Sequence, residues 1–172
     1  FSKRLFNIKK EKSIFSFNDI SHLALEALSD NKGKPSNTAI EFQNKFDEII
    51  LDEYQDISEL QEAILSLISR KNELSNRFMV GDIKQCIYGF RFANPYLFAK
   101  KYEIYTPDFS KAKNDGYRID LSKNFRSREC ILSAINFIFK QIMTKEFSGI
   151  EYDKNAMLYY GADFPPQPEG VN

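Results

Sequence analysis

The sequence predicts an α/β fold in which a mostly parallel sheet is flanked by helices. Three short apolar stretches have the length and composition of strands, and segments with apolar residues at helical spacing alternate with them. Such alternation is typical of parallel sheets, because a crossover segment must return the chain between parallel strands. With 172 residues, of which 42% are hydrophobic, the chain is long enough for one sizeable core, or for one domain and part of a second.

The chain before residue 46 is expected to contain two helices separated by a loop. Residues 16–20 are typical of a helix start, with Asn18 or Asp19 as the cap. The helix after them has four apolar residues at helical spacing: Leu23, Ala24, Ala27 and Leu28. Residues 30–37 contain glycine and proline and are expected to form a loop, and a short helix over 39–45 leads into the first strand.

Residues 48–51 form the first predicted strand, whose continuous apolar core indicates burial on both faces. The next helix starts near Ser58, because the hydroxyl of Ser58 and the amide of Gln61 fit a capping box. That helix runs to about Arg70 and places four apolar residues on one face: Leu60, Ile64, Leu67 and Ile68.

The second predicted strand covers residues 78–80 and ends at Gly81. Pro95 marks the first turn of the helix that follows, since proline fits the first helical position. Residues 106–116 are polar and loop-like, and 117–121 form the third predicted strand.

The last part of the chain predicts one amphipathic helix and an extended tail. The helix covers residues 130–143 and has five apolar side chains facing inward: Ile131, Ala134, Ile135, Ile138 and Ile142. Three prolines, at positions 165, 166 and 168, indicate that the tail is extended. The chain has no internal repeat, and we expect its three strands to belong to a single sheet.

Composition excludes several kinds of site. The 24 Lys and Arg residues balance 24 Asp and Glu residues, so no overall charge drives the chain to a polyanion or a membrane. Cys86 and Cys130 lack metal-ligand spacing, and the single histidine, His22, argues against a zinc site or a Ser–His pair.

No apolar run reaches the roughly 20 residues of a membrane span, and no signal peptide opens the chain. We expect a cytoplasmic protein with reduced thiols, and a chain that begins at Phe1 indicates a piece of something longer.

A polar cluster follows each of the three predicted strands, at residues 52–55, 81–85 and 123–126. Because ligands of such sheets bind at the carboxyl ends of the strands, we expect the clusters to meet on one edge. Carboxylates, glutamines and an arginine would gather there, which suits hydrolysis of a nucleoside triphosphate. In that chemistry one acid holds Mg²⁺ through water, the next orients the attacking water, an amide contacts the γ-phosphate and an arginine neutralises developing charge.

These clusters resemble the motifs of a known family. Residues 46–61, 79–94 and 121–127 are similar to the second, third and fourth motifs of the UvrD/Rep class of superfamily 1 DNA helicases. The strings DEYQD, VGDIKQCIYGFRFANP and LSKNFRSR most resemble AddA (RexA), the family of helicase–nuclease subunits of bacterial recombination-repair complexes. FSFND, at 15–19, resembles the short motif that precedes the acidic one. The resemblance implies a partial RecA-like P-loop NTPase fold that lacks the phosphate-loop strand.

The resemblance implies a role for each of five polar residues. Asp52 would be the acid associated with Mg²⁺, and Glu53 would be the base that activates the attacking water. Gln55 would help to couple the nucleotide site to the third motif. Gln85 would contact the γ-phosphate or its water, and Arg126 would act as an arginine finger.

The third motif also implies a surface for DNA. Tyr88 and Phe90 match aromatic positions that stack on single-stranded bases, and Arg91 matches a neighbouring DNA-contacting arginine. Base–aromatic stacking contributes roughly 1–3 kcal/mol per base and tolerates any sequence, as a translocating motor requires. The chain departs from the family pattern at Cys86, where serine is usual, and at Gly89, where AddA-like chains often have arginine. Neither departure removes a catalytic group.

The resemblance also implies how much of a motor the chain contains. No G-x-x-x-x-G-K-[ST] string occurs, and Gly33-Lys34 is followed by Pro35, which excludes a phosphate loop there. Residues 1–126 would be the later half of the first RecA-like motor domain, and 127–172 would start the second and end in the extended tail. The stretch alone is therefore expected to be inactive.

The resemblance further implies the activity and partners of the parent. The parent would couple ATP hydrolysis to translocation on DNA and its unwinding in double-strand-break repair, and would carry an associated exonuclease. ATP and Mg²⁺ are the expected cofactors. The expected partners are single-stranded and double-stranded DNA and an AddB-like (RexB-like) nuclease subunit, with no membrane involved.

Simpler interpretations stay open from the residues alone. The acids at 52 and 53 also fit an exposed strand end before a capped helix, and Tyr88 and Phe90 fit packing aromatics. Arg126 also fits an ion-pair partner of Asp52 or Asp82. For the whole chain, the alternatives are a UvrD/Rep-type repair helicase without a nuclease, and a non-catalytic DNA-binding or docking module derived from one. A phosphate loop encoded upstream of residue 1 would favour the motor.

Overall fold

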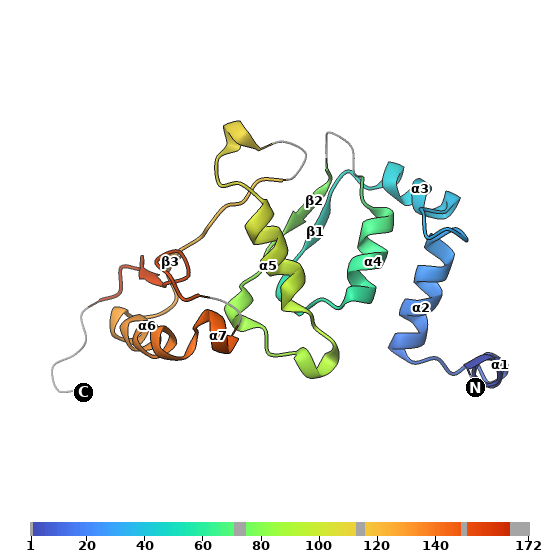
Figure 1. Ribbon diagram of the computed structural model, residues 1–172, viewed down its shortest axis with the longest axis horizontal. Coiled ribbons are helices and arrows are strands. Elements are labelled where there is room, and N and C mark those ends of the chain that lie inside the picture. The colour runs from blue at the N-terminus through green and yellow to red at the C-terminus, as the bar shows by residue number, and fades with distance from the viewer. Residues whose placement is uncertain (1, 71–74, 113–115, 149–150, 166–172) are drawn as a thin grey trace. The chain divides into compact units, whose positions relative to one another are not determined.

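The computed structural model describes residues 2–70, 75–112, 116–148 and 151–165 (Figure 1). The chain divides into two compact units, Phe1–Arg118 and Ile119–Asn172. Both contain helices and short parallel strands, so the predicted mixed α/β class is confirmed. None of the helices in the described part of the chain has the length and apolarity needed to cross a membrane.

The first unit has two strands, β1 (Ile49–Leu51) and β2 (Arg77–Met79). Its helices are α1 (Ser2–Glu11), α2 (Phe17–Leu28), α3 (Asn37–Lys45), α4 (Glu59–Ile68) and α5 (Pro95–Ile104). Short 3-10 helices η1 (Tyr54–Asp56), η2 (Ile83–Gln85), η3 (Gly89–Arg91) and η4 (Phe109–Lys111) lie in the connections. Figure 1 shows α4 and α5 beside the two strands.

The core of the first unit lies where α2, α3 and α4 pack together. Its buried residues are Leu28, Ala39 and Leu67, and four half-buried side chains pack against them: Leu25, Phe42, Ile64 and Ile68. Three of the four residues in the apolar stripe predicted for α4 therefore belong to the core cluster, Ile64, Leu67 and Ile68, and Leu60 is not among them.

Helix starts follow local side-chain chemistry. Ser58 accepts from the backbone of Gln61 and Gln61 bonds back to Ser58, so the predicted capping box is confirmed. The cap of α2 differs from the prediction, because Ser16 is the N-cap and Asp19 completes its capping box. The hydrogen bond from the ammonium of Lys9, 2.6 Å away, and those from Ser16 hold the pKa of the Asp19 carboxyl well below its usual range.

The sheet of the first unit has two parallel strands, with Ile50 opposite Phe78. Both side chains are exposed, at 67% for Ile50 and 55% for Phe78, so the expected burial of both faces is wrong. Successive side chains of a strand point to opposite faces of the sheet. Helix α4 covers the face on which Arg77, next to Phe78, reaches Glu62, whereas Ile50 and Phe78 point to the opposite, exposed face.

The predicted third strand at 117–121 is also wrong. Tyr117 forms only an isolated bridge with Thr106, and Leu121 is 86% exposed. Arg118 is instead held against α5. Its guanidinium donates to the backbone carbonyl of Tyr102, and its guanidinium carbon lies 3.8 Å from the centre of the Tyr102 ring.

The second unit contains β3 (Lys123–Asn124), α6 (Glu129–Ile142), α7 (Lys145–Ser148) and β4 (Tyr159–Tyr160). β3 pairs with β4 in a sheet separate from that of β1 and β2, so the described strands do not form the single sheet that was expected. The predicted extended tail lies mostly in residues 166–172, outside the described residues.

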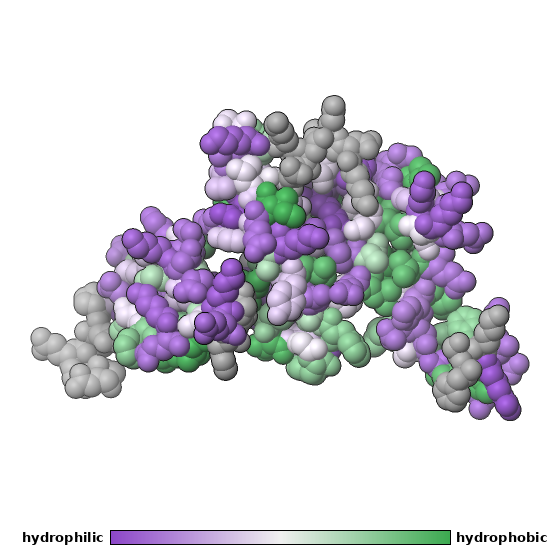
Figure 2. Space-filling model, viewed as in Figure 1, coloured by the Kyte–Doolittle hydropathy of each residue, from purple (hydrophilic) through white to green (hydrophobic). Residues whose placement is uncertain are grey.

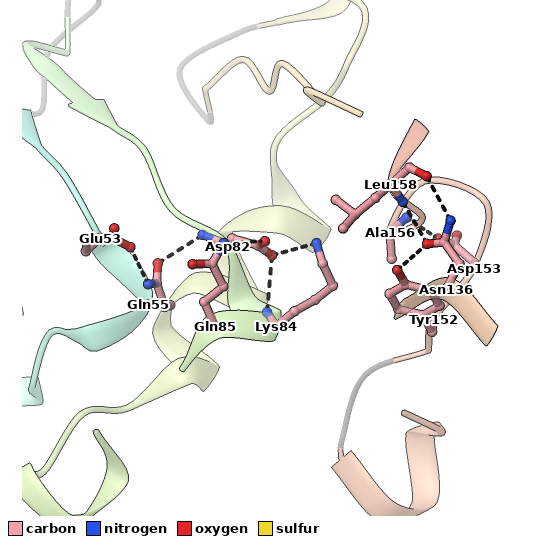
Figure 3. Close-up of polar contacts among 10 residues, drawn as sticks. All are labelled: Glu53, Gln55, Asp82, Lys84, Gln85, Asn136, Tyr152, Asp153, Ala156 and Leu158. Atoms are coloured by element: carbon pink, nitrogen blue, oxygen red, sulfur yellow. Dashed lines mark hydrogen bonds and ion pairs between the residues drawn. The ribbon is translucent and has the colours of Figure 1, made fainter. Parts of the chain in front are cut away.

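The helix predicted at 130–143 is confirmed as α6, but its buried face is different. Leu132 is 2% exposed and Phe139 packs on Tyr152 with ring centres 5.5 Å apart. Four of the five side chains predicted to face inward are exposed, Ile131, Ala134, Ile138 and Ile142, and Ile135 is half-buried. The side chain of Asn136, four positions after Leu132, donates to the carbonyl of Leu158 and accepts from the hydroxyl of Tyr152, and these bonds are consistent with burial of that face (Figure 3).

A polar network inside the first unit attaches η1 to its surroundings. The ring of Tyr54 is fully buried, and its hydroxyl donates to Glu62 at 2.9 Å. Glu62 also accepts from Arg77 at 2.9 Å and lies 3.4 Å from the ammonium of Lys101. Burial raises the pKa of Tyr54, and the hydrogen bond to Glu62 raises it further. Burial also acts to raise the pKa of Glu62, but Arg77, Lys101 and Tyr54 together lower it below its usual value.

We predict that Glu62→Gln lowers the free energy of unfolding of the chain by about 1–3 kcal/mol at neutral pH, since Arg77 loses its ionic partner. Because the folded-state pKa of Glu62 lies below its ordinary value of 4.5, the carboxylate stabilises the fold above that pH. This stabilisation is lost as the pH falls through the folded-state pKa. The difference between the two proteins should therefore shrink in acid.

Thermal unfolding of both proteins, followed by circular dichroism across this pH range, measures the difference. Glu48→Gln removes an exposed carboxylate and is the control, expected to unfold like the unaltered chain. A difference that does not change with pH would contradict the ionic role of Glu62.

Candidate functional site

The acidic pair lies at the carboxyl end of β1. The Oδ1 atom of Asp52 accepts the backbone N–H of Glu53 at 2.9 Å, and both side chains are exposed. Glu53 has φ 50° and ψ 44°, the left-handed region that costs a non-glycine residue roughly 1–2 kcal/mol. Such strained backbone clusters at functional sites when the surrounding structure maintains it.

Gln55 joins the ends of β1 and β2. Its side chain is 1% exposed, its Nε2 donates to Oε2 of Glu53 at 2.6 Å, and its Oε1 accepts the backbone N–H of Asp82 at 2.9 Å (Figure 3). The backbone N–H of Tyr54 also donates to the carbonyl of Val80. The acidic loop, residues 52–56, is therefore attached to the loop after β2 through these two hydrogen bonds of Gln55, the Gln55 bridge. The predicted coupling role of Gln55 requires such an attachment, and the role itself stays a prediction.

Gly81 leaves the space that this bridge needs. A Cβ at position 81 would lie 2.7 Å from Oε1 of Gln55 and 3.1 Å from the backbone nitrogen of Tyr54. The loop after β2 approaches the acidic loop this closely because residue 81 has no side chain.

Asp82 orients Gln85. Its Oδ2 accepts Nε2 of Gln85 at 2.9 Å, and its Oδ1 accepts Nζ of Lys84 at 2.7 Å. The amide nitrogen of Gln85 is thereby held toward Asp82. Asp82 and Lys84 were not among the predicted site residues, although a carboxylate directly after Gly81, with a lysine two residues on, was a signal for such a turn.

The donor set fits a magnesium ion that arrives with a nucleotide. Among the described residues, no group of three or more His, Cys, Asp or Glu side chains converges as a metal cage. Mg²⁺ usually keeps several waters and is held by one or two carboxylates together with substrate phosphates. Asp52 is exposed at the strand end and could supply one such carboxylate.

Arg126 belongs to the second unit, directly after β3. Asn124 accepts the backbone N–H groups of Arg126 and Ser127, both at 2.9 Å, which orders this turn. Within the described residues, the guanidinium of Arg126 is exposed and forms no hydrogen bond or ion pair. We expected a third strand of the same sheet to bring Arg126 beside the acids. This is wrong, because β3 belongs to a separate sheet. The arginine-finger role of Arg126 stays a prediction.

The predicted DNA-contacting residues lie together in the aromatic loop, residues 87–92. The rings of Tyr88 and Phe90 are 5.9 Å apart, and the guanidinium carbon of Arg91 is 5.5 Å from each ring centre. Phe90 is 75% exposed, which excludes a core role in the described chain. Ile87 and Phe92 are also exposed. Figure 2 shows hydrophobic side chains at the lower edge of the view, where Figure 1 draws the chain before α5.

Cys86 follows η2 directly, and its thiol lies near the carboxylate of Asp56 in η1. Burial raises the pKa of its thiol, and the nearby charge of Asp56 raises it further. The thiol therefore stays neutral at neutral pH and is a weak hydrogen-bond donor where the family pattern has serine.

Comparison with known proteins identifies the family. Residues 1–106 match the family model of the UvrD/REP helicase N-terminal domain. The chain belongs to this family. The family indicated by the three motifs is thus confirmed, and the acidic loop, Gln55 bridge and aromatic loop all lie in the matched part of this UvrD/REP-family chain.

Similar proteins share one name, which describes each of them as the A-type subunit of an ATP-dependent helicase/nuclease. The protein of that name from Pelotomaculum thermopropionicum is 50% identical over 167 residues, which are 94% of this chain and 13% of the relative. The Listeria innocua protein is 47% identical over 96% of the chain, and the Staphylococcus carnosus protein is 46% identical over 100%. The chain spans 13–14% of the length of these UvrD/REP-family relatives.

We predict that Gly81→Ala destabilises the chain by about 1–3 kcal/mol, because the added methyl group must displace the buried amide of Gln55. Gly89→Ala is a matched control, since a Cβ there meets no atom within 4 Å, and we expect a change within about 0.5 kcal/mol. Chemical denaturation of both variants measures the difference. Equal stabilities would contradict the close approach at Gly81.

Proposed function

We propose that this chain is part of an ATP-dependent DNA helicase/nuclease subunit that couples ATP hydrolysis to translocation on DNA and its unwinding in double-strand-break repair. Family membership and the name shared by the relatives support this proposal. The observation that carries it is the Gln55 bridge, which joins the proposed base, Glu53, to the loop that holds Gln85.

The proposed chemistry is attack of water on the γ-phosphorus of ATP, with release of ADP and phosphate. Glu53 accepts the proton of the attacking water, and the bond to the bridging oxygen of ADP breaks. Gln85, which Asp82 holds in place, contacts the γ-phosphate or its water. Arg126 neutralises the charge that develops on the phosphate. Mg²⁺, when bound near Asp52, supplies charge stabilisation to the phosphates.

The proposed fold is the RecA-like fold of P-loop NTPases. We place residues 1–126 in the later half of the first motor domain and 127–172 at the start of the second. The chain has no phosphate-loop string, so we expect no ATP hydrolysis by these 172 residues alone. The proposed partners of the full-length protein are single-stranded and double-stranded DNA and an AddB-like (RexB-like) nuclease subunit, in the cytoplasm.

The proposed DNA contact is the aromatic loop. Exposed rings stack on bases of any sequence, and a guanidinium beside them attracts the phosphate backbone. Tyr88, Phe90 and Arg91 provide these groups within one turn of chain.

We predict that Glu53→Gln in the full-length protein lowers the ATP turnover number by at least about a hundredfold, because the amide cannot accept the proton. Binding of ATP should persist, since the variant keeps the size of the side chain. Steady-state hydrolysis and equilibrium nucleotide binding test this pair of results, with Glu48→Gln as the control for an exposed carboxylate. Unchanged turnover would refute the assignment of the base.

We predict that Phe90→Ala weakens DNA-stimulated ATP hydrolysis more than hydrolysis without DNA, raising the DNA concentration for half-maximal stimulation about tenfold. Phe109→Ala is the control, because Phe109 is 77% exposed, close to the 75% of Phe90, and lies outside the aromatic loop. Equal losses with and without DNA would instead indicate a packing role for Phe90.

A further inference from the structure

The aromatic loop is attached at one end to the candidate nucleotide edge, the loops after β1 and β2 at residues 52–56 and 81–85, and at the other end to residues 57–59, which follow the first of these loops. At its start, η2 brings Gln85 to Asp82, which the Gln55 bridge holds. At its end, the chain enters α5 through Asn94. The second attachment belongs to none of the roles predicted from the motifs.

Asn94 uses three polar groups in this attachment. Its backbone N–H donates to the carbonyl of Ile57 at 2.9 Å, and its Nδ2 donates to Oε1 of Glu59 at 3.0 Å. Its Oδ1 accepts the backbone N–H of Tyr96 at 3.1 Å and caps α5. The preceding residue, Ala93, forms an antiparallel bridge with Ser58.

The segment that receives these bonds follows the acidic loop directly. Ile57 is the residue after η1, and Ser58 and Glu59 begin α4 through the capping box. A carboxylate in the first turn of a helix is stabilised by the helix dipole, which favours a fixed acceptor at Glu59. The tether, formed by residues 57–59 and 93–94, therefore joins the end of the aromatic loop to the capped start of α4.

A cap alone does not account for these contacts. Asparagine is common at N-caps, and its Oδ1 would suffice for that purpose. The donation from Nδ2 to Glu59 and the backbone bond to Ile57 add nothing to the cap of α5, but they fix where the aromatic loop ends.

We propose that Asn94 is a positioning residue, which through Glu59 holds the aromatic loop in register with the acidic loop, so that DNA binding and the nucleotide site are coupled. This inference rests on the proposed function. It assigns to Asn94 an effect on DNA affinity and coupling without direct contact with DNA or nucleotide.

Asn94→Asp in the full-length protein tests the proposal. Aspartate keeps the acceptor that caps α5, but it replaces the amide donor with a second carboxylate facing Glu59. We expect the concentration of oligo(dT) that half-stimulates ATP hydrolysis to rise about tenfold, whereas the rate at saturating oligo(dT) changes far less. A half-stimulating concentration equal to that of the unaltered protein would overturn the proposal.

A reversed pair separates positioning from a general loss of structure. Glu59→Gln combined with Asn94→Asp restores an amide–carboxylate hydrogen bond with its donor on the other side, so we expect recovery to within about threefold. Glu59→Gln alone keeps an acceptor for Asn94 and should have a small effect. Failure of the pair to recover would overturn the proposal. Absence of any stimulation by oligo(dT) in the unaltered protein would instead overturn the proposed function, and this inference with it.

Discussion

The amide of Gln55 holds together the two strand ends on which the candidate nucleotide edge depends. It donates to the carboxylate of Glu53 and accepts from the backbone of Asp82, so both of its polar groups are used in one bridge. A buried amide is costly when its partners are lost, which gives the two loops one preferred arrangement. The bridge exists because Gly81 lets the loops approach closely. Through Asp82, the same arrangement reaches Gln85 at the start of the aromatic loop.

The three consecutive residues after Asp52 lie in three different environments. Glu53 stays exposed at the edge, Tyr54 enters the core and donates to Glu62, and Gln55 bridges the strand ends. A continued strand could not do this, because its side chains alternate between only two faces. The left-handed conformation of Glu53 and the following 3-10 turn provide the third direction. The buried contacts of the next two residues offset the strain at Glu53.

Local signals in the sequence were sufficient wherever structure depends on neighbouring residues. The capping box of Ser58 and Gln61 and the start of α5 at Pro95 were predicted because their partners lie within four positions. The third strand failed because Arg118 found a partner on α5, which no periodicity in residues 117–121 could reveal. The exposure of Ile50 escaped prediction for a related reason, since an apolar run does not say which face a helix covers.

By itself, the sequence determined the order of the motifs, the family that they indicate, and most helix starts, because these depend on residue type at short spacing. Only the tertiary structure decided that Gln55 bridges two loops, that Asp82 orients Gln85, and that α6 buries Leu132, beside the half-buried Asn136, rather than its isoleucine stripe. The Gln55 bridge depends on a hydrogen bond between residues 27 positions apart. The buried face of α6 depends on a choice between two apolar faces of one helix, together with a hydrogen bond across 22 positions. Gln85 lies only three positions from Asp82, but spacing alone does not say which acceptor its amide takes. The spacing of residues along the chain does not determine the free energy of such contacts, so it could not predict which of them the folded chain forms.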